Sequence, residues 1–248
     1  MLSARALDGL PEIAPGDDLA ALIAGALPEP PQAGDVLVLA HKVVSKAEGR
    51  VCNLRNVQPS ERALELARDG DKDPRHVQVV LDETRALLRA ERGVLICETH
   101  NGFVCANAGV DGSNVPGADQ VVLLPVDPDA SARALRQLLH ELLGVSPGVL
   151  ITDSFGRAWR HGQVDVAIGC AGISPLEDWR GHSDAYGLEL RATWIAIADE
   201  LAAAADLARG KDAMQPVVLV KGCERHVAAD DGPGARALIR AKQEDLFR

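Results

Sequence analysis

Three polar segments of the sequence carry the residue types that phosphate and metal chemistry uses. They are residues 40–50 (AHKVVSKAEGR), 106–115 (ANAGVDGSNV) and 152–163 (TDSFGRAWRHGQ). In the first, Ser45 and Lys46 follow an apolar run, and α/β sheets usually bind their ligands just beyond strand ends. A lysine ammonium there could hold a phosphate as a point charge. The alternative is a solvated strand end, the commoner setting for a single lysine.

The second and third segments supply carboxylates that could hold a divalent cation. Asp111 and Asn114 lie among small residues, which let the backbone approach a ligand closely. Asp153 follows an apolar run and precedes the hydroxyl of Ser154, a pair that suits Mg²⁺ or Mn²⁺. Two such carboxylates would neutralise a nucleoside triphosphate and align an in-line transfer. A tight Asp-Gly turn and a salt-bridged loop are the structural alternatives.

Two arginines suggest an anionic ligand, and several incomplete motifs exclude common classes of enzyme. Arg157 and Arg160 could bind a carboxylate or phosphate in a bidentate way. The sequence has no GxxxxGK[ST] phosphate loop, and His140-Glu141 lacks the second histidine of HExxH. Ser154 lacks the leading glycine of a nucleophile elbow. We therefore expect neither a P-loop enzyme nor a serine hydrolase.

Composition excludes several classes of protein. The 248 residues are 47% hydrophobic and 25% charged, which is enough apolar material for a folded core. The net charge of −10 opposes binding to nucleic acid and to anionic membranes, and 3% aromatic residues leave few platforms for base stacking. Five cysteines without a CxxC indicate reduced thiols in a cytoplasm. Neither a signal peptide nor a membrane span is expected.

The apolar runs predict the strands that position these segments. Strands are expected at 36–40 and 148–152, before the first and third segments. Asn101-Gly102 predicts a hairpin with a type I′ turn between residues 94–97 and 103–106. Further strands are expected at residues 121–126, at 164–168, with Asp165 facing a site, and at 216–220.

Helices are predicted between these strands. Asp127 and Pro128 predict the start of a helix that Gly144 closes. Other helices are expected over residues 59–69, 75–88 and 188–207, and in the tail 233–247, at least as far as residue 240. The irregular mixture favours a mixed α/β (α+β) fold over a doubly wound sheet.

Together these segments resemble the coenzyme F420-0:L-glutamate ligase (gamma-glutamyl ligase, CofE) family and the ligase half of the actinobacterial enzyme FbiB. The matching stretches run in order along nearly the whole chain, and ANAGVDGSN is the most specific of them. The others are residues 10–13 (LPEI), 16–19 (GDDL), 44–50 (VSKAEGR), 153–160 (DSFGRAWR), 163–169 (QVDVAIG) and 244–248 (EDLFR).

This resemblance implies a fold and an activity. It implies a CofE-like fold of mixed sheets and hairpins, assembled as an intertwined homodimer. It also implies a GTP-dependent enzyme that joins L-glutamate to coenzyme F420-0 through an acyl phosphate and then adds γ-linked glutamates. Mg²⁺ or Mn²⁺ is implied as cofactor, with K⁺ as a further ion. We expect one ligase unit over residues 1–248, without the nitroreductase-like domain of FbiB.

The resemblance also assigns roles to residues. Asp111, Asp153 and Ser154 match metal-binding positions, with the two aspartates also counted as catalytic. Arg157 and Arg160 are candidates for holding a substrate carboxylate. Nucleotide-contacting positions are matched by Leu10, Pro11, Glu12, Ile13, His41, Lys46 and Asn114. Ser45 is added as a nucleotide-binding candidate from its place after the buried strand.

The sequence departs from the family at three points. His41 stands where many members have serine, and Ser154 replaces the commoner threonine while keeping the hydroxyl. Lys211 stands near a metal-binding glutamine of archaeal members, which puts a second metal there in doubt.

Three alternative functions stay open at this point. One is a nucleotide-dependent amide ligase for a different acceptor. The others are a non-catalytic nucleotide-binding paralogue and a flavin- or deazaflavin-binding protein without ligase activity.

Overall fold

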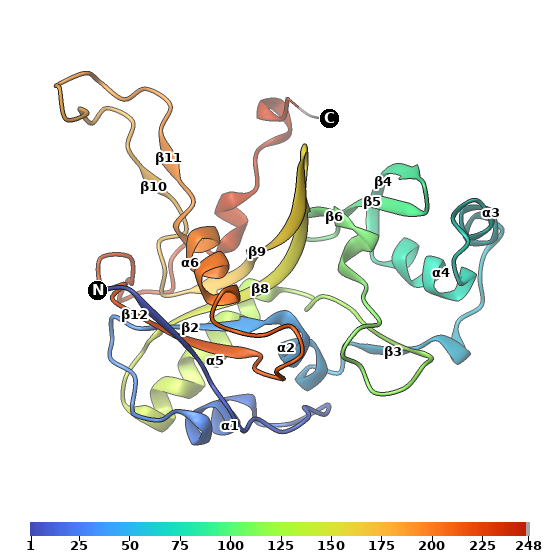
Figure 1. The fold of residues 1–248 in the computed structure, drawn as a ribbon, viewed down its shortest axis with the longest axis horizontal. Coiled ribbons are helices and arrows are strands. Elements are labelled where there is room, and N and C mark those ends of the chain that lie inside the picture. The colour runs from blue at the N-terminus through green and yellow to red at the C-terminus, as the bar shows by residue number, and fades with distance from the viewer. Residues whose placement is uncertain (247–248) are drawn as a thin grey trace.

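The computed structural model describes residues 1–246, and its largest element is a five-stranded mixed sheet (Figure 1). Across the sheet the strands are β1 (Ser3–Ala6), β12 (Val217–Lys221), β2 (Val36–Ala40), β8 (Gly148–Arg157) and β9 (Arg160–Ala171). Only β2 and β8 pair in parallel, and the other neighbours are antiparallel. The predicted mixed α/β class is therefore confirmed.

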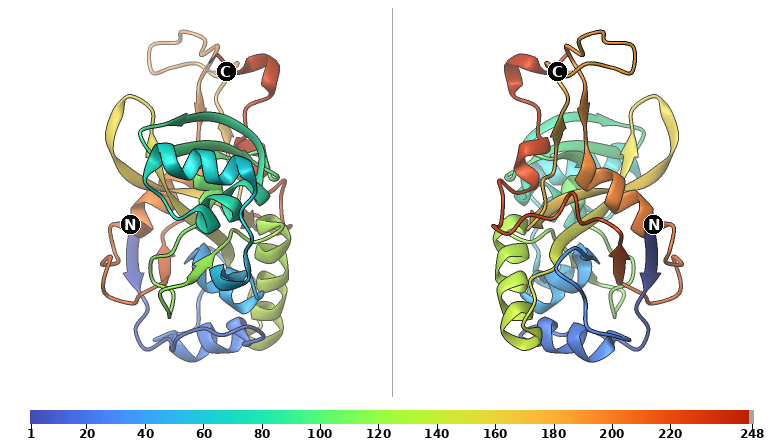
Figure 2. Two further views of the ribbon diagram at one scale, coloured as in Figure 1. Left: turned by 90° about the vertical axis from the view of Figure 1, so that its right-hand side faces the viewer. Right: turned by 90° about the vertical axis from the view of Figure 1, so that its left-hand side faces the viewer.

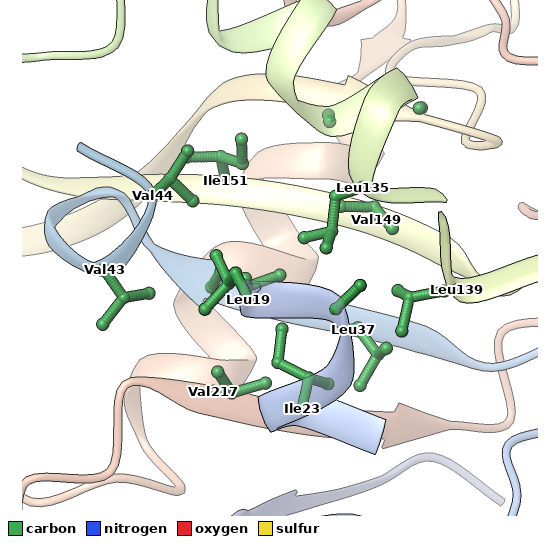
Figure 3. Close-up of a cluster of buried hydrophobic side chains, with 14 of the residues drawn as sticks. Leu19, Ile23, Leu37, Val43, Val44, Leu135, Leu139, Val149, Ile151 and Val217 are labelled. Atoms are coloured by element: carbon green, nitrogen blue, oxygen red, sulfur yellow. The ribbon is translucent and has the colours of Figure 1, made fainter. Parts of the chain in front are cut away.

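Both faces of this sheet are buried, which is why its strands read as continuous apolar runs. Leu37 and Leu39 of β2 point to one face, while Val36 and Val38 point to the other. Figure 3 shows the first face, where side chains of three helices pack against the sheet. The helices on that face are α1 (Leu19–Ala26), α2 (His41–Ala47) and α5 (Pro128–Leu143), and α6 (Ile197–Asp206) packs on the other face.

A smaller unit with its own core lies beside the main sheet (Figures 1 and 2). Its buried residues include Val77, Val80, Leu95 and Cys97. The unit contains α3 (Glu61–Gly70), α4 (Pro74–Asp82), β4 (Thr84–Glu91), β5 (Val94–Thr99) and β6 (Val104–Ala106). It is linked to the main sheet through β3 (Val51–Asn53) and η1 (Leu54–Asn56), and through the pairing of β3 with β7 (Gln120–Val122).

Local signals determine the ends of the correctly predicted helices. The Asp127 carboxylate accepts a hydrogen bond from the Ala130 N–H at 3.0 Å, and Pro128 occupies the first helical position of α5. Gly144 adopts φ +72° and closes the helix. At α3 the Ser60 hydroxyl accepts from the Ala63 N–H.

The helix predicted over residues 75–88 is wrong beyond residue 82. Residues 84–91 form β4, which pairs with β5 through a tight turn at Arg92-Gly93. Both turn residues have positive φ, as a type I′ turn requires. Leucine, alanine and arginine favour a helix locally, but the backbone pairing with β5 overrides that weak preference.

The predicted hairpin between residues 94–97 and 103–106 is confirmed, but its turn type is wrong. A type I′ turn needs positive φ at both central residues, and Asn101 does not have it. Instead the Gly102 N–H donates to the Thr99 carbonyl at 2.9 Å, with Gly102 at φ +91°. This is the pattern of a three-residue loop that ends on a left-handed glycine.

The helix predicted over residues 188–207 begins nine residues later, at Ile197. The preceding residues belong to a projecting arm whose base is the pair β10 (Glu177–Asp178) and β11 (Trp194–Ile195) (Figure 1). Within the arm, the Asp184 carboxylate accepts from the Leu188 N–H at 2.9 Å. Such local side-chain bonds compete with the helix.

The tail predicted as helical over 233–247 contains only two short 3₁₀ turns, η3 (Ala235–Leu238) and η4 (Lys242–Glu244). The buried Asp129 carboxylate accepts a hydrogen bond from the Ala235 N–H at 2.7 Å. This contact holds the backbone of the tail in an irregular conformation. Phe247, at the end of that prediction, lies outside the described residues. The strand predicted at 121–126 is shorter than expected, ending at Val122.

Within residues 1–246, the helices are all too short or too polar to cross a lipid bilayer.

Gly169 of β9 packs against the start of α5 so closely that a methyl group would lie 2.4 Å from the Pro128 carbonyl. We expect Gly169→Ala to lower the free energy of unfolding by about 2 kcal/mol or more, because the helix backbone must shift. Urea unfolding followed by circular dichroism measures this. Gly156→Ala is the control, since nothing lies within 4 Å there. Equal effects at the two positions would contradict the packing argument.

Candidate functional site

A pocket of about 510 Å³ opens where β2 ends and β8 continues past it. The last pair between these strands is Ala40 with Thr152, so α2 (His41–Ala47) begins beside Asp153 and Ser154. This is the edge at which parallel strands usually present a ligand site. Three further segments complete the walls, at residues 10–13, 111–116 and 206–216.

The pocket gathers most of the residues predicted from the sequence. Lining it are Leu10, Pro11, Glu12, Ile13, His41, Lys46, Asp111, Asn114, Asp153 and Ser154. Ser45 lies just behind the wall, fully buried, with its Oγ 3.2 Å from His41 Nδ1. Residues that lie more than a hundred positions apart in the chain thus surround one cavity.

Arg157 and Arg160 do not line this pocket. They face each other across the tip of the β8–β9 hairpin, where both are exposed. Arg157 donates a hydrogen bond to the His161 carbonyl at 2.7 Å. Their role as ligands of a substrate carboxylate stays a prediction.

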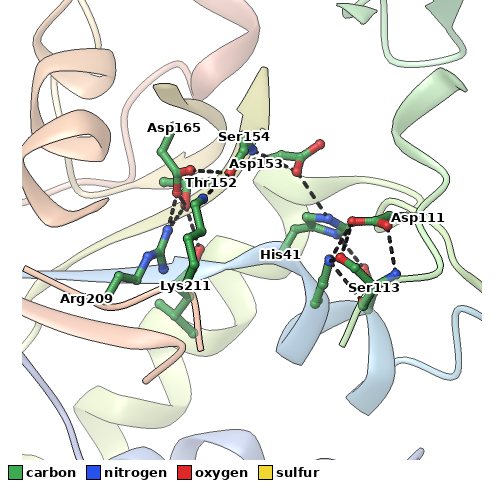
Figure 4. A network of polar contacts seen from close by, with 12 residues as sticks. His41, Asp111, Ser113, Thr152, Asp153, Ser154, Asp165, Arg209 and Lys211 are labelled. Carbon is green, nitrogen blue, oxygen red and sulfur yellow. Dashed lines mark hydrogen bonds and ion pairs between the residues drawn. The ribbon is translucent and has the colours of Figure 1, made fainter. Parts of the chain in front are cut away.

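Asp111 sits in a cluster of donors on one wall of the pocket (Figure 4). Lys42 Nζ lies 2.6 Å from Asp111 Oδ2, and the Ser113 N–H and hydroxyl donate to its two oxygens at 2.8 and 2.7 Å. Burial alone would raise the pKa of Asp111, but the bonds from Lys42 and Ser113 outweigh it and lower the pKa. Asp111 is therefore ionised at neutral pH.

The turn before Asp111 has an unusual backbone. Asn107, Ala108 and Gly109 adopt φ values of +53°, +52° and +74° in succession, a left-handed run that costs energy at the two non-glycine positions. Lys72 supports the turn by donating to Asn107 Oδ1 at 3.0 Å. A side chain at Gly109 would collide with Leu124 at 2.6 Å. The alanine–glycine pattern of the motif is thus explained by the path that leads to Asp111.

On another wall, α2 is tied to the N-terminal segment by an ion pair. Lys46 Nζ lies 2.5 Å from Glu12 Oε1 and 2.8 Å from the Asn114 carbonyl oxygen. The Lys46 side chain is 8% exposed, so its charge is held inside the wall of the pocket. This contact joins three of the predicted nucleotide-contacting segments at one ammonium group.

Asp153 lies opposite a buried histidine. His41 Nε2 is 3.4 Å from Asp153 Oδ1, beyond good hydrogen-bond length, and has no hydrogen-bond partner within residues 1–246. The same Asp153 oxygen accepts the Ser154 N–H at 2.8 Å. The carboxylate is thereby oriented from the backbone side.

Sequence reasoning missed four side chains of the site. Lys42 lies inside a predicted segment, but its neighbours alone give no reason to prefer it. Ser113 is interpreted from the sequence as a turn residue, whereas the structure places it beside Asp111 and Lys42. Thr152 was read as strand, but its hydroxyl lies in the pocket wall. Arg209 carried no signal, because it reaches the site only through the packing of α6.

Comparisons with known proteins agree with this arrangement. A family model described as F420-0:Gamma-glutamyl ligase matches residues 9–222. A coenzyme F420:L-glutamate ligase of Methanopyrus kandleri is 48% identical over 239 residues, covering 96% of this chain and 94% of the relative. Another, of Methanothermobacter thermautotrophicus, is 41% identical over 251 residues, covering 100% of this chain and 99% of the relative. The chain belongs to the F420-0:gamma-glutamyl ligase family. It is therefore an acid–amino-acid ligase, as the sequence predicted.

The family resemblance implies a divalent cation, and the donor atoms of this gamma-glutamyl ligase site fit one. Asp111, Asp153 and Ser154 present hard oxygen atoms to the same pocket. Within residues 1–246 no three acidic, histidine or cysteine residues form a closed cluster. Mg²⁺ typically takes one or two carboxylates and completes its shell with phosphates and water.

Two lysine ammonium groups contact the oxygens of Asp111 and Ser154. Lys42 contacts Asp111, and Lys211 Nζ lies 3.0 Å from Ser154 Oγ and 3.5 Å from Asp206 Oδ1 (Figure 4). Lysine ammonium groups thus contact two of the three side chains that the resemblance assigns to a metal.

Replacing Asp111 with asparagine should reduce stability in a pH-dependent way. The folded pKa lies below the unfolded value of about 3.9. The ionised group therefore stabilises the fold at neutral pH, and that stability is lost as pH falls below about 4. Because the side chain is nearly half exposed, we expect about 1 kcal/mol at pH 7. Urea unfolding of both proteins between pH 3 and 7 measures this, with Asp69→Asn on the exposed face of α3 as control. A difference that stays constant down to pH 3 would contradict the assignment.

Proposed function

We propose that this ligase joins L-glutamate to coenzyme F420-0 with GTP as co-substrate, releases GDP and phosphate, and then adds γ-linked glutamates. The observation that carries this is a single pocket in which two carboxylates alternate with lysine ammonium groups. The relatives named coenzyme F420:L-glutamate ligase support the choice of acceptor and amino acid. The volume of about 510 Å³ suits a ligand of nucleotide size.

Binding of a triphosphate to this acidic protein requires local positive charge. The pocket holds Lys42, Lys46 and Lys211, each paired with an acidic or hydroxyl oxygen. A phosphate could accept the hydrogen bonds of these ammonium groups. The carboxylates would then pair with a divalent cation in place of lysine, so that no charge is left unpaired. We therefore assign the phosphates to the region between residues 41–46 and 111–114.

The reaction follows from the chemistry of a carboxylate, which does not react with an amine until it is activated. An acceptor carboxylate oxygen attacks the γ-phosphorus of GTP, the bond to the bridging oxygen breaks, and GDP leaves. The glutamate nitrogen then attacks the acyl phosphate, loses a proton, and expels phosphate as the amide bond forms. Mg²⁺ or Mn²⁺ supplies charge neutralisation when bound.

The protein's own contribution is positioning and electrostatics. Asp111 holds Lys42 in place, Asp153 would hold the divalent cation, and the lysines neutralise developing phosphate charge. No protein nucleophile is needed. Burial raises the pKa of the Cys105 and Cys170 thiols to about 12, which opposes formation of a thiolate.

Three further assignments belong to the same proposal. We place the enzyme in the cytoplasm, which its five free thiols support. We propose a homodimer, for which the projecting arm and the exposed β8–β9 hairpin are candidate contact elements. K⁺ is proposed as an accessory ion.

The proposal is tested with purified protein, GTP, Mg²⁺ or Mn²⁺, L-glutamate and F420-0, with products measured by mass spectrometry. We expect mass additions of successive glutamates with release of GDP. Asp111→Ala and Asp153→Ala should each lower the rate by about 100-fold or more, because each removes a charge that balances the phosphates. Asp69→Ala is the control and should keep full activity.

The negative outcomes are distinct. Nucleotide binding without any mass addition would overturn the assigned acceptor and favour another ligase or a non-catalytic paralogue. Full activity of Asp111→Ala would overturn the assigned site while leaving the reaction in place.

A further inference from the structure

A buried carboxylate in the pocket wall, at the residue that the sequence predicts to face a site, makes contacts that the proposed mechanism does not use. Asp165 on β9 is 1% exposed. Its oxygens accept hydrogen bonds from Thr152 Oγ1 at 2.8 Å and from Ser154 Oγ at 2.7 Å, and it pairs with the Arg209 guanidinium (Figure 4). The antiparallel register of β8 and β9 pairs Ser154 with Asp165 and so brings these side chains together.

The contacts of Ser154 determine the direction of its hydroxyl. An ionised carboxylate can only accept a hydrogen bond, and an ammonium group can only donate one. Ser154 Oγ lies 2.7 Å from Asp165 Oδ1 and 3.0 Å from Lys211 Nζ. The hydroxyl proton therefore points to Asp165, and a lone pair of Oγ points into the pocket toward the Lys211 ammonium group.

We propose that Asp165 is a positioning residue that holds the Ser154 hydroxyl proton and so turns the oxygen lone pair toward a cation bound in the pocket. The inference rests on the proposed function only in taking that cation to be Mg²⁺ or Mn²⁺. A hydroxyl that donates to a carboxylate is a better electron-pair donor, and partners of this kind behind a metal ligand typically change affinity by 10- to 100-fold.

Arg209 makes this arrangement possible. It lies just after α6, its side chain is 10% exposed, and it donates to Thr152 Oγ1 at 3.1 Å and to the Pro216 carbonyl at 3.3 Å. It therefore neutralises a carboxylate that would be costly to bury alone. The same side chain fixes the pocket segment 206–216, which carries Lys211, relative to β8.

The test measures Mn²⁺ binding directly, from the loss of the free Mn²⁺ electron paramagnetic resonance signal. We expect Asp165→Asn to weaken Mn²⁺ binding about 10-fold, since the amide must turn its NH₂ group toward one of the three donors. Ser154→Ala should weaken it similarly. If Asp165 acts through Ser154, the double variant should bind no more weakly than Ser154→Ala alone.

Two further variants separate positioning from stability. Asp69→Asn removes an exposed carboxylate of α3 outside the pocket and should leave Mn²⁺ affinity within about 2-fold of wild type. Because Asp165→Asn removes the nearer partner of the buried Arg209 and leaves only the contact with Asp206 Oδ1 at 3.7 Å, it is also made together with Arg209→Met, which removes both charges of the Asp165–Arg209 pair. This double variant should show the same 10-fold weakening in a protein of native circular dichroism.

The outcomes decide the inference separately from the substrate. The inference would be overturned if Asp165→Asn weakened Mn²⁺ binding equally in the wild-type and Ser154→Ala backgrounds. It would also be overturned if the wild-type protein bound no Mn²⁺. The predicted coupling in a protein that adds no glutamate to F420-0 would uphold it while overturning the assigned acceptor. If the wild type adds glutamate to F420-0 but the effects of Asp165→Asn and Ser154→Ala on Mn²⁺ binding are additive, the proposed function would be upheld and this inference overturned.

Discussion

The parallel pairing of β2 with β8 is the constraint on which the site depends. Its register brings Ala40 opposite Thr152, so the chain that leaves β2 enters α2 beside the part of β8 that continues beyond the pair. His41 therefore meets Asp153 without any long loop. A shift by one residue would turn every side chain of the strand to the opposite face. The two apolar faces oppose such a shift, because Leu37 and Val38 are both fully buried against different helices.

The pocket is organised by charge pairs that are complete before a ligand binds. Lys42 with Asp111, Lys46 with Glu12, and Arg209 with Asp165 each bring a cation and an anion to its wall. An isolated charge at these depths would be expensive, so the pairs allow many ionised groups to line one cavity. In the function that we propose, the same pairs would be exchanged for contacts with phosphate and a divalent cation. This is how a protein of net charge −10 can offer a site for a polyanion.

The smaller unit contributes to the site through backbone geometry more than through charge. Its Lys72 supports the left-handed turn at residues 107–109, and that turn leads to Asp111. The conformational cost of such a turn must be offset by favourable packing. Here Ala108 and Val110 are buried in the core of the smaller unit. The position of one wall of the pocket therefore depends on a core that lies outside the main sheet.

The sequence by itself determined the mixed α/β class, the helix over 128–143 and the three polar segments 40–50, 106–115 and 152–163 that contribute to the pocket, because caps, glycines and apolar runs act through near neighbours. It also indicated the family, through motifs that run in order along the chain. Only the tertiary structure decided that residues 84–91 form a strand, that α6 begins at Ile197, and that Arg157 and Arg160 lie at a hairpin tip away from the pocket. It alone brought Arg209 to Asp165 and Lys211 to Ser154. These outcomes depend on pairing and packing between distant segments, and the free energy of those contacts exceeds the weak local preferences that a sequence displays.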